Sequence, residues 1–222
     1  MIRLVVFDWD GTLMDSEARI VTAMQRAFAD ADATPPGRAA VREIIGLDLG
    51  HAVAHLGPTL DRARQGAVVH AYRAIYAGLH AIPSPLFAGA ADTLRALDAS
   101  GLMLAVATGK SRRGLERALD EAGVRGHFVA TRCGEELAPK PDPAMLRDIL
   151  LELDTPPGEA LMLGDTEFDL LMANAAATRS GAVTYGAHER ARLLALAPDL
   201  VIDDLRDLPT ALARLNDELS LR

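Results

Sequence analysis

The feature that most constrains the fold is a short apolar run that ends in two acidic residues. Residues 4–7 read Leu-Val-Val-Phe, and Asp8 and Asp10 follow within three positions. A continuous apolar run of this length, rich in β-branched side chains, is typical of a strand buried on both faces of a parallel sheet. Gly11-Thr12 then supplies a turn through which the chain can leave the sheet. The run therefore predicts an α/β fold in which acidic residues directly follow one buried strand.

The two carboxylates point to a cation at this strand end. In an extended backbone, side chains two positions apart leave the same face, so Asp8 and Asp10 would repel one another. Such a pair is stable when a cation lies between the carboxylates or when one of them is protonated. Mg²⁺ is the natural candidate because it prefers oxygen ligands. The alternative is an acidic turn that caps a helix, a place where Asp is also common.

A purely helical segment follows the first strand. Ser16 is a plausible N-cap, and apolar residues recur at helical spacing from there to the Pro35-Pro36 break. Gly46 and Gly57-Pro58 separate three further predicted helices, at residues 37–46, 48–56 and 59–79. The absence of a strand pattern predicts an inserted helical cap at residues 15–83. Residues 1–14 and 84–222 would then form the core.

Beyond residue 84 the pattern alternates between strand and helix. Predicted strands lie at residues 102–107, 127–131, 160–163, 181–185 and 199–202, with helices at 89–99, 111–123, 144–153, 167–176 and 207–219. This alternation predicts a doubly wound parallel sheet, a Rossmann-like core with right-handed crossovers. In such sheets ligands bind outside the carboxyl ends of the strands.

The polar signals fall at those strand ends. Thr108-Gly109 follows one strand, Asp165 and Asp169 follow another, and Lys140 stands between prolines in a loop that enters a helix. Thr108-Gly109 could be a plain strand exit, but a hydroxyl and free N–H groups before a helix also suit an anion. Asp165 and Asp169 would repel one another unless a cation lies near. Only Lys110 and Lys140 are lysines among 23 basic side chains, and a compact ammonium group suits a cramped site beside carboxylates.

The composition of the chain limits which binding partners and which cellular compartment we expect. A formal charge of −8 and a pI near 5.2 argue against nucleic acid or an anionic membrane as the main partner. Cys133 is the single cysteine, so no internal disulfide forms, which fits a reducing cytoplasm. The apolar run after Arg3 is too short for a signal peptide, and no stretch reaches membrane-spanning length. We expect a cytoplasmic protein; the sequence indicates no oligomeric state.

Taken together, the motifs resemble those of the haloacid dehalogenase-like hydrolase superfamily, in particular its phosphatases with a helical cap after the first strand. The resemblance rests on four segments in order along the whole chain: Asp8-Trp9-Asp10-Gly11-Thr12-Leu13, Thr108-Gly109, Lys140 and Gly164-Asp165-Thr166-Glu167-Phe168-Asp169. It implies that Asp8 attacks phosphorus to form an aspartyl-phosphate and that Asp10 serves as the general acid and base.

The resemblance also implies roles for the remaining motif residues. Mg²⁺ would be held by Asp8, the backbone carbonyl of Asp10 and Asp165. Thr108 and the N–H of Gly109 would bind phosphoryl oxygens. Lys140 would offset the carboxylates and touch the phosphate, and Asp169 would position Lys140.

Asp10 discriminates between branches of this superfamily. The dehalogenase and phosphonate-cleaving branches lack a carboxylate at that position, so the expected activity is hydrolysis of a small phosphate ester. Over its whole length the amino-acid sequence is most similar to the sequences of phosphoglycolate phosphatases. Sugar-phosphate mutases of the β-phosphoglucomutase type share the four motifs and remain an alternative, and a phosphate-binding module without activity is an alternative of another class. Candidate specificity residues are Arg42, Asp48, His51 and Lys110, and alanines at 175–177 stand where relatives usually carry a glycine.

Overall fold

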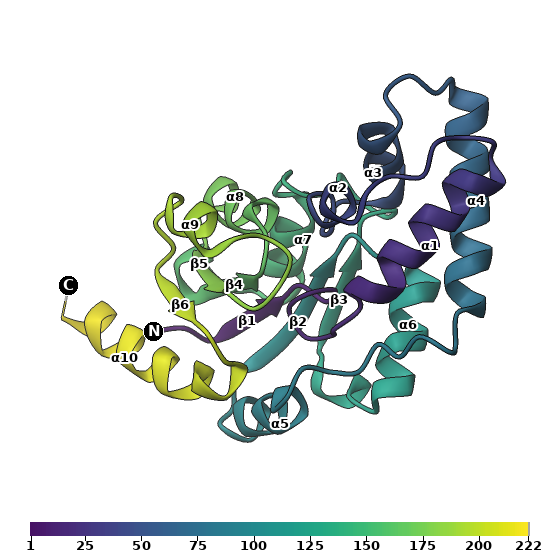
Figure 1. Ribbon diagram of the computed structural model, residues 1–222. Helices are drawn as coiled ribbons and strands as arrows, with labels where there is room; N and C mark the ends of the chain where they lie inside the picture. The colour runs from purple at the N-terminus through teal and green to yellow at the C-terminus, as the bar shows by residue number, and fades with distance from the viewer. Residues whose placement is uncertain (222) are drawn as a thin grey trace.

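The computed structural model describes residues 1–221 and contains one six-stranded parallel sheet (Figure 1). The strands are β1 (Leu4–Phe7), β2 (Met103–Thr108), β3 (Ala130–Cys133), β4 (Ala160–Gly164), β5 (Arg179–Val183) and β6 (Leu200–Ile202). Their order is β3-β2-β1-β4-β5-β6, so the direction of winding reverses between β1 and β4. In this register Phe7 stands opposite both Val106 and Leu163. The ends of the three central strands therefore lie level with one another at the switch point, where such sheets bind ligands.

Helices cover both faces of the sheet, which confirms the doubly wound architecture. On one face lie α5 (Ala90–Ala99), α6 (Arg112–Ala122) and α10 (Leu208–Ser220), and their leucines pack with alternate residues of β1 and β2. On the other face α7 (Ala144–Glu152) and α8 (Glu167–Ala176) bury Met145, Ile149 and Met172 against Leu4, Val6 and Met162. The central strands are thus apolar on both sides, as their continuous apolar runs predicted.

Four helices lie between β1 and α5 at one end of the molecule (Figure 1). They are α1 (Glu17–Asp30), α2 (Arg38–Arg42), α3 (Leu49–Leu56) and α4 (Arg62–Gly78). Their apolar faces form a cluster that includes Met24, Phe28, Val53 and Val68, and among the described residues it takes in only Ala187 from outside the segment. The two chain segments that connect these helices to the sheet lie side by side: the Asp15 N–H donates to the Pro85 carbonyl at 2.8 Å, and Met14 pairs with Leu86. The inserted helices thus leave and rejoin the core at one place.

Several expected boundaries differ from the structure. The helix expected at 37–46 ends at Arg42, because the chain turns before Gly46, which has a φ of +100°. The helix expected from 59 begins at Arg62, because the Asp61 side chain accepts the Arg64 N–H. The strand expected at 127–131 lies at 130–133, after a 3₁₀ turn at Arg125–His127, and further 3₁₀ turns lie at Pro157–Glu159 and Leu205–Asp207. The strand expected at 181–185 begins at Arg179, and the short helix α9 (Arg190–Leu194) carried no pattern that predicted it.

None of the helices in the described residues 1–221 combines the length and the apolar character needed to cross a lipid bilayer.

The end of α8 carries a local strain that a glycine would relieve. Ala177 has a φ of +58°, and the N–H groups of Ala177 and Thr178 close the helix on the carbonyls of Asn174 and Ala173. A Cβ is unfavourable in this left-handed conformation, whereas glycine adopts it readily. We expect Ala177→Gly to raise the free energy of unfolding by about 1 kcal/mol in urea titrations. Ala175→Gly, inside the same helix, should instead lower it by about 1 kcal/mol. A loss of stability in Ala177→Gly would contradict this account.

Candidate active site

A buried lysine joins two acids at the carboxyl end of the sheet. The Lys140 Nζ lies 2.6 Å from Asp8 Oδ1 and 2.6 Å from Asp169 Oδ1, and its side chain is 0% exposed. Asp8 follows β1, Lys140 lies in the loop between β3 and α7, and Asp169 stands in the first turn of α8. Burial acts to lower the pKa of Lys140, but the carboxylates of Asp169 and Asp8 outweigh it, and the net pKa is raised. Lys140 is therefore a permanent cation under the sheet's acidic end.

A third carboxylate completes an acidic cluster. Asp8, Asp165 and Asp169 each offer an oxygen within 4.8 Å of the others, and all three residues are buried. Burial, the largest cause, and the charges of Asp169 and Asp165 keep the pKa of Asp8 well above its usual range. Burial and the charge of Asp169 likewise raise the pKa of Asp165 to about 7. Lys140 alone does not balance these charges.

The cluster has the donor set that a hard divalent cation requires. Asp8 Oδ2 is buried and has no hydrogen-bond partner among the described residues, and leaving a buried carboxylate oxygen unpaired is costly. An ion with oxygen ligands beside these three carboxylates would offset their surplus negative charge. The residues present thus fit a metal ion. The Asp10 side chain, in contrast, is not one of the three clustered carboxylates.

Neighbouring groups fix the orientation of Asp165 and Asp169. Asp165 accepts the Thr12 hydroxyl at 2.8 Å and the Ala187 N–H at 2.7 Å. Gly11, at a φ of +90°, leaves the space for this carboxylate, because a Cβ there would lie 2.2 Å from Asp165 Oδ2. Asp169 Oδ2 accepts the N–H of Thr166 at 3.1 Å and its hydroxyl at 2.7 Å, so the helix cap holds it. The Thr-x-x-Asp spacing is that of a capping box, so the sequence could have predicted this contact between Thr166 and Asp169.

Asp10 lies in a second polar cluster with Lys110. The Lys110 Nζ is 2.9 Å and 2.7 Å from the two Asp10 oxygens, and the Ser16 hydroxyl donates to Asp10 Oδ1 at 2.6 Å. Ser16 is the N-cap residue of α1, as expected, but its side chain makes no cap bond. Lys110 also lies 3.5 Å from the Tyr76 hydroxyl, which connects the Asp10 cluster to α4. Both lysines of the chain therefore form ion pairs with carboxylates at this end of the sheet.

A cavity of about 660 Å³ opens between these strand ends and the inserted helices. Its lining includes Asp8, Asp10, Thr108, Gly109 and Lys110 from the core. A Cβ on Gly109 would lie 2.5 Å from the carbonyl oxygen of Leu47, so only glycine permits the inserted segment to approach this closely. The volume is typical of a small-molecule site.

Two of the four candidate specificity residues lie in the cavity wall and two do not. Asp48 and Lys110 line the cavity, whereas Arg42 and His51 do not. Arg42 donates to the carbonyls of Gly186 and Ala187 at 3.2 and 3.0 Å, beside the Asp165 loop. His51 is exposed and pairs with Asp48.

Other cavity residues were not identified from the sequence. They include Arg19, Tyr72, Tyr76, Ser84 and Arg113, which the packing of α1, α4, α6 and the return segment brings to the wall. Lys140, Asp165 and Asp169 are not part of that wall, so a direct contact of Lys140 with phosphate stays a prediction.

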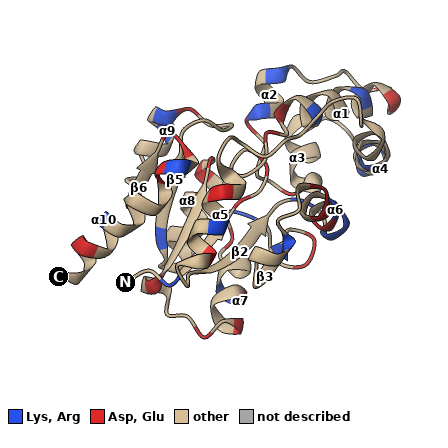
Figure 2. Ribbon diagram, turned by 90° about the horizontal axis from the view of Figure 1, so that it is seen from below, with Lys and Arg blue, Asp and Glu red and all other residues tan. Residues whose placement is uncertain are grey.

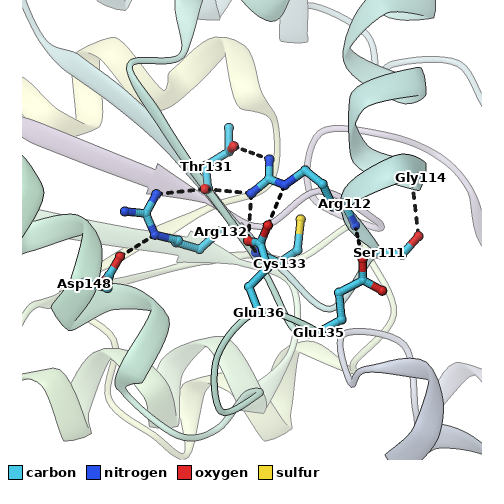
Figure 3. A network of polar contacts seen from close by, with 9 residues as sticks. All are labelled: Ser111, Arg112, Gly114, Thr131, Arg132, Cys133, Glu135, Glu136 and Asp148. Carbon is cyan, nitrogen blue, oxygen red and sulfur yellow. Dashed lines mark hydrogen bonds and ion pairs between the residues drawn. The ribbon is translucent and has the colours of Figure 1, made fainter.

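A separate ion-pair network holds the loop that carries Lys140 (Figure 3). Arg112 at the start of α6 pairs with Glu136 at 2.7 Å and donates to Thr131, while the Cys133 N–H donates to Glu136 at 3.0 Å. Burial raises the pKa of the Cys133 thiol to about 12, so this cysteine is an unreactive thiol. Elsewhere acidic and basic positions are interspersed along the ribbon (Figure 2).

The acidic cluster predicts how pH affects stability without metal. Because the folded pKa of Asp165 is about 7 and its ordinary value 3.8, the folded state holds its proton more tightly than the unfolded state. Stability is therefore lost as pH rises from about 4 to about 7. We expect the melting temperature in chelator to fall over this range, and added Mg²⁺ to raise it more at about pH 7.5 than at about pH 5. An equal effect of Mg²⁺ at both pH values would contradict the assignment.

Comparison with known proteins agrees with this architecture. Residues 5–183 match the family model described as haloacid dehalogenase-like hydrolase. The chain is 34% identical over 215 residues to "Phosphoglycolate phosphatase 1" of Pseudomonas aeruginosa, covering 93% of this chain and 78% of that protein. It is 34% identical over 212 residues to "Probable phosphatase IndB" of Dickeya dadantii, covering 94% and 92%.

A solved structure shares the fold. The crystal structure of a predicted phosphoglycolate phosphatase from Haemophilus somnus 129pt superposes with a TM-score of 0.84 at 24% identity, covering 94% of this chain and 97% of that one. The Rossmann-like fold and the hydrolase class expected from the sequence are thereby confirmed. The family match spans most of the chain. It includes β1, β4 and the acidic residues that follow these two strands. The chain belongs to the haloacid dehalogenase-like hydrolases.

Proposed function

We propose that the protein hydrolyses phosphate monoesters of small metabolites through an aspartyl-phosphate on Asp8. The observation that carries this proposal is the asymmetry of the Asp8 carboxylate. Its Oδ1 is fixed by Lys140 at 2.6 Å, whereas its Oδ2 has no hydrogen-bond partner within residues 1–221, and the residue lines the cavity. A carboxylate held at one oxygen and unpaired at the other is arranged for nucleophilic attack.

The reaction proceeds in two displacements. Asp8 attacks the phosphorus, the bond from phosphorus to the ester oxygen breaks, and Asp10 transfers a proton to that oxygen. A water molecule then attacks the phosphorus of the aspartyl-phosphate, its proton passes to Asp10, and the bond to Asp8 breaks to release phosphate. The Ser16 hydroxyl and the Lys110 ammonium group hold the Asp10 carboxylate beside the cavity for both transfers.

The other residues bind and orient the phosphoryl group. Thr108 and Gly109 line the cavity just before α6, and the Thr108 hydroxyl and the Gly109 N–H would bind phosphoryl oxygens. Asp8, the Asp10 carbonyl and Asp165 would hold Mg²⁺, which would supply positive charge to offset the anionic phosphate. Asp169 fixes the position of Lys140 through a second ion pair on the same ammonium group that contacts Asp8.

Residues 15–83 act in this proposal as a cap that roofs the cavity. Support comes from their separate apolar cluster and from the contact of Leu47 with Gly109. The names of the relatives make 2-phosphoglycolate the first substrate to test. A cytoplasmic location rests on the single cysteine and stays a prediction.

A screen of small phosphate esters tests the proposal. Purified protein with Mg²⁺ should release phosphate from p-nitrophenyl phosphate and 2-phosphoglycolate, and a chelator should abolish the release. β-Glucose 1-phosphate serves as a control, because its isomerisation without phosphate release would indicate a mutase. Absence of release from every ester in the presence of Mg²⁺ would contradict the proposed hydrolysis.

A further inference from the structure

The wall of the cavity contains a buried arginine without an acidic partner. Arg19, in the first turn of α1, is 9% exposed and lines the same cavity as Asp8 and Asp10. Within residues 1–221 no ion pair connects it to a carboxylate, although most other arginines that are not exposed make one. Burying a cation is costly unless an anion or several acceptors compensate it.

The hydrogen bonds of Arg19 leave one edge of its guanidinium group free. The Nε and Nη2 atoms donate at 3.1 and 2.8 Å to a single acceptor, the Tyr76 carbonyl, and the group stacks on the Tyr76 ring at 4.6 Å. These contacts fix the plane of the group. The edge formed by Nη1 and the second N–H of Nη2 has no acceptor among the described residues. Two parallel N–H donors match the two oxygens of a carboxylate.

A second unsatisfied polar group lies in the same wall. The Ser84 hydroxyl oxygen is buried, lines the cavity and has no hydrogen-bond partner among the described residues. Ser84 precedes Pro85, whose carbonyl accepts the Asp15 N–H, so it lies next to the start of α1. Because buried polar groups are almost always paired, the unpaired Ser84 hydroxyl and the free edge of Arg19 in the same cavity wall indicate a polar ligand.

We infer that Arg19 binds a carboxylate on the leaving group and thereby determines specificity, with Ser84 as an additional donor. The inference rests on the proposed hydrolysis, because it assigns Arg19 to the part of the substrate that lies away from phosphorus. The preferred substrates are then short phosphate monoesters that carry a carboxylate. Because this contact exists both before and during the reaction, it contributes to KM more than to kcat.

Two matched esters test the inference. 2-Phosphoglycolate carries the carboxylate, and 2-phosphoglycolamide carries a neutral amide of the same shape. The wild-type protein should prefer the carboxylate in kcat/KM by about 100-fold, mostly through KM. Arg19→Gln should collapse this ratio to near unity, and Ser84→Ala should reduce it by a smaller factor. Arg26→Gln, at an exposed arginine on the same helix, should leave the ratio unchanged.

The outcomes separate this inference from the proposed function. A wild-type protein that hydrolyses both esters equally would overturn the role of Arg19, and so would an Arg19→Gln variant that loses both esters to the same degree. Calorimetry on Asp8→Asn decides the matter independently of turnover: 2-phosphoglycolate should bind about 100-fold more tightly than the amide, and Arg19→Gln should remove the difference. If no ester is hydrolysed, the proposed function fails. The difference in binding between the two esters still tests whether Arg19 binds the carboxylate.

Discussion

Asp8→Asn is expected to lower kcat for hydrolysis of p-nitrophenyl phosphate by about 10⁴-fold or more, as removal of a nucleophile generally does. The amide cannot form the acyl phosphate, and no other carboxylate combines a buried unpaired oxygen with a place in the cavity wall within residues 1–221. The measurement is phosphate release under saturating Mg²⁺. Asp30→Asn, at an exposed site on α1, is the matched control and should retain full activity.

The same substitution should stabilise the metal-free protein. The pKa of Asp8 is raised because burial and the charges of Asp169 and Asp165 disfavour its ionised form. A neutral amide of the same shape removes this penalty, and Lys140 keeps Asp169 as a partner at 2.6 Å. Urea titrations in chelator should therefore give an unfolding free energy at least equal to that of the wild-type protein. Substantial remaining turnover in Asp8→Asn would eliminate Asp8 as the nucleophile.

Lys140→Met is expected to abolish activity and to lower the free energy of unfolding by about 3–5 kcal/mol. The side chain is 0% exposed and contributes the one ammonium group that contacts Asp8 and Asp169 within the described chain. Its removal leaves three buried carboxylates without a cation. Denaturation in urea at about pH 7.5 with chelator measures this loss.

A double variant tests the cause of that loss. If repulsion between carboxylates destabilises Lys140→Met, then adding Asp8→Asn should restore part of the stability, and the two effects should not be additive. Added Mg²⁺ should also restore stability in the single variant by replacing the missing positive charge. A Lys140→Met protein less than about 1 kcal/mol below the wild type would contradict the role assigned to this ion pair.

The residues that the chain topology brings together were predictable from the sequence. Asp8 and Asp165 each follow a buried apolar strand, and parallel strands end at the same edge of a sheet, so their convergence follows from the strand assignment. The rarity of lysine identified both ammonium groups, and each binds a carboxylate at the predicted edge. These inferences use only local pattern and the general rules of parallel sheets.

The cavity wall was not predictable in the same way. Arg19 lies in a helical pattern that gives its face but not its neighbours, and its position depends on how α1 packs on α4 near Tyr76. Arg42 and His51 have suitable chemistry in the inserted segment, but the packing directs them away from the cavity. Ser16 has the residue type of a helix cap, and its proximity to Asp10 decides its contact instead. Such choices depend on tertiary distances that spacing along the chain does not encode.

The paired segments at Asp15 and Pro85 have an evolutionary consequence. Because the inserted helices enter and leave through two adjacent backbone positions, we expect a change in their length or sequence to move neither neighbouring strand. In the proposed function, Asp8, Lys140 and Asp165 lie outside this insertion, whereas Arg19, which we assign to the leaving group, lies within it. Duplicated copies can acquire new substrates by exchanging residues between these two positions, while the carboxylates and lysine below are inherited intact.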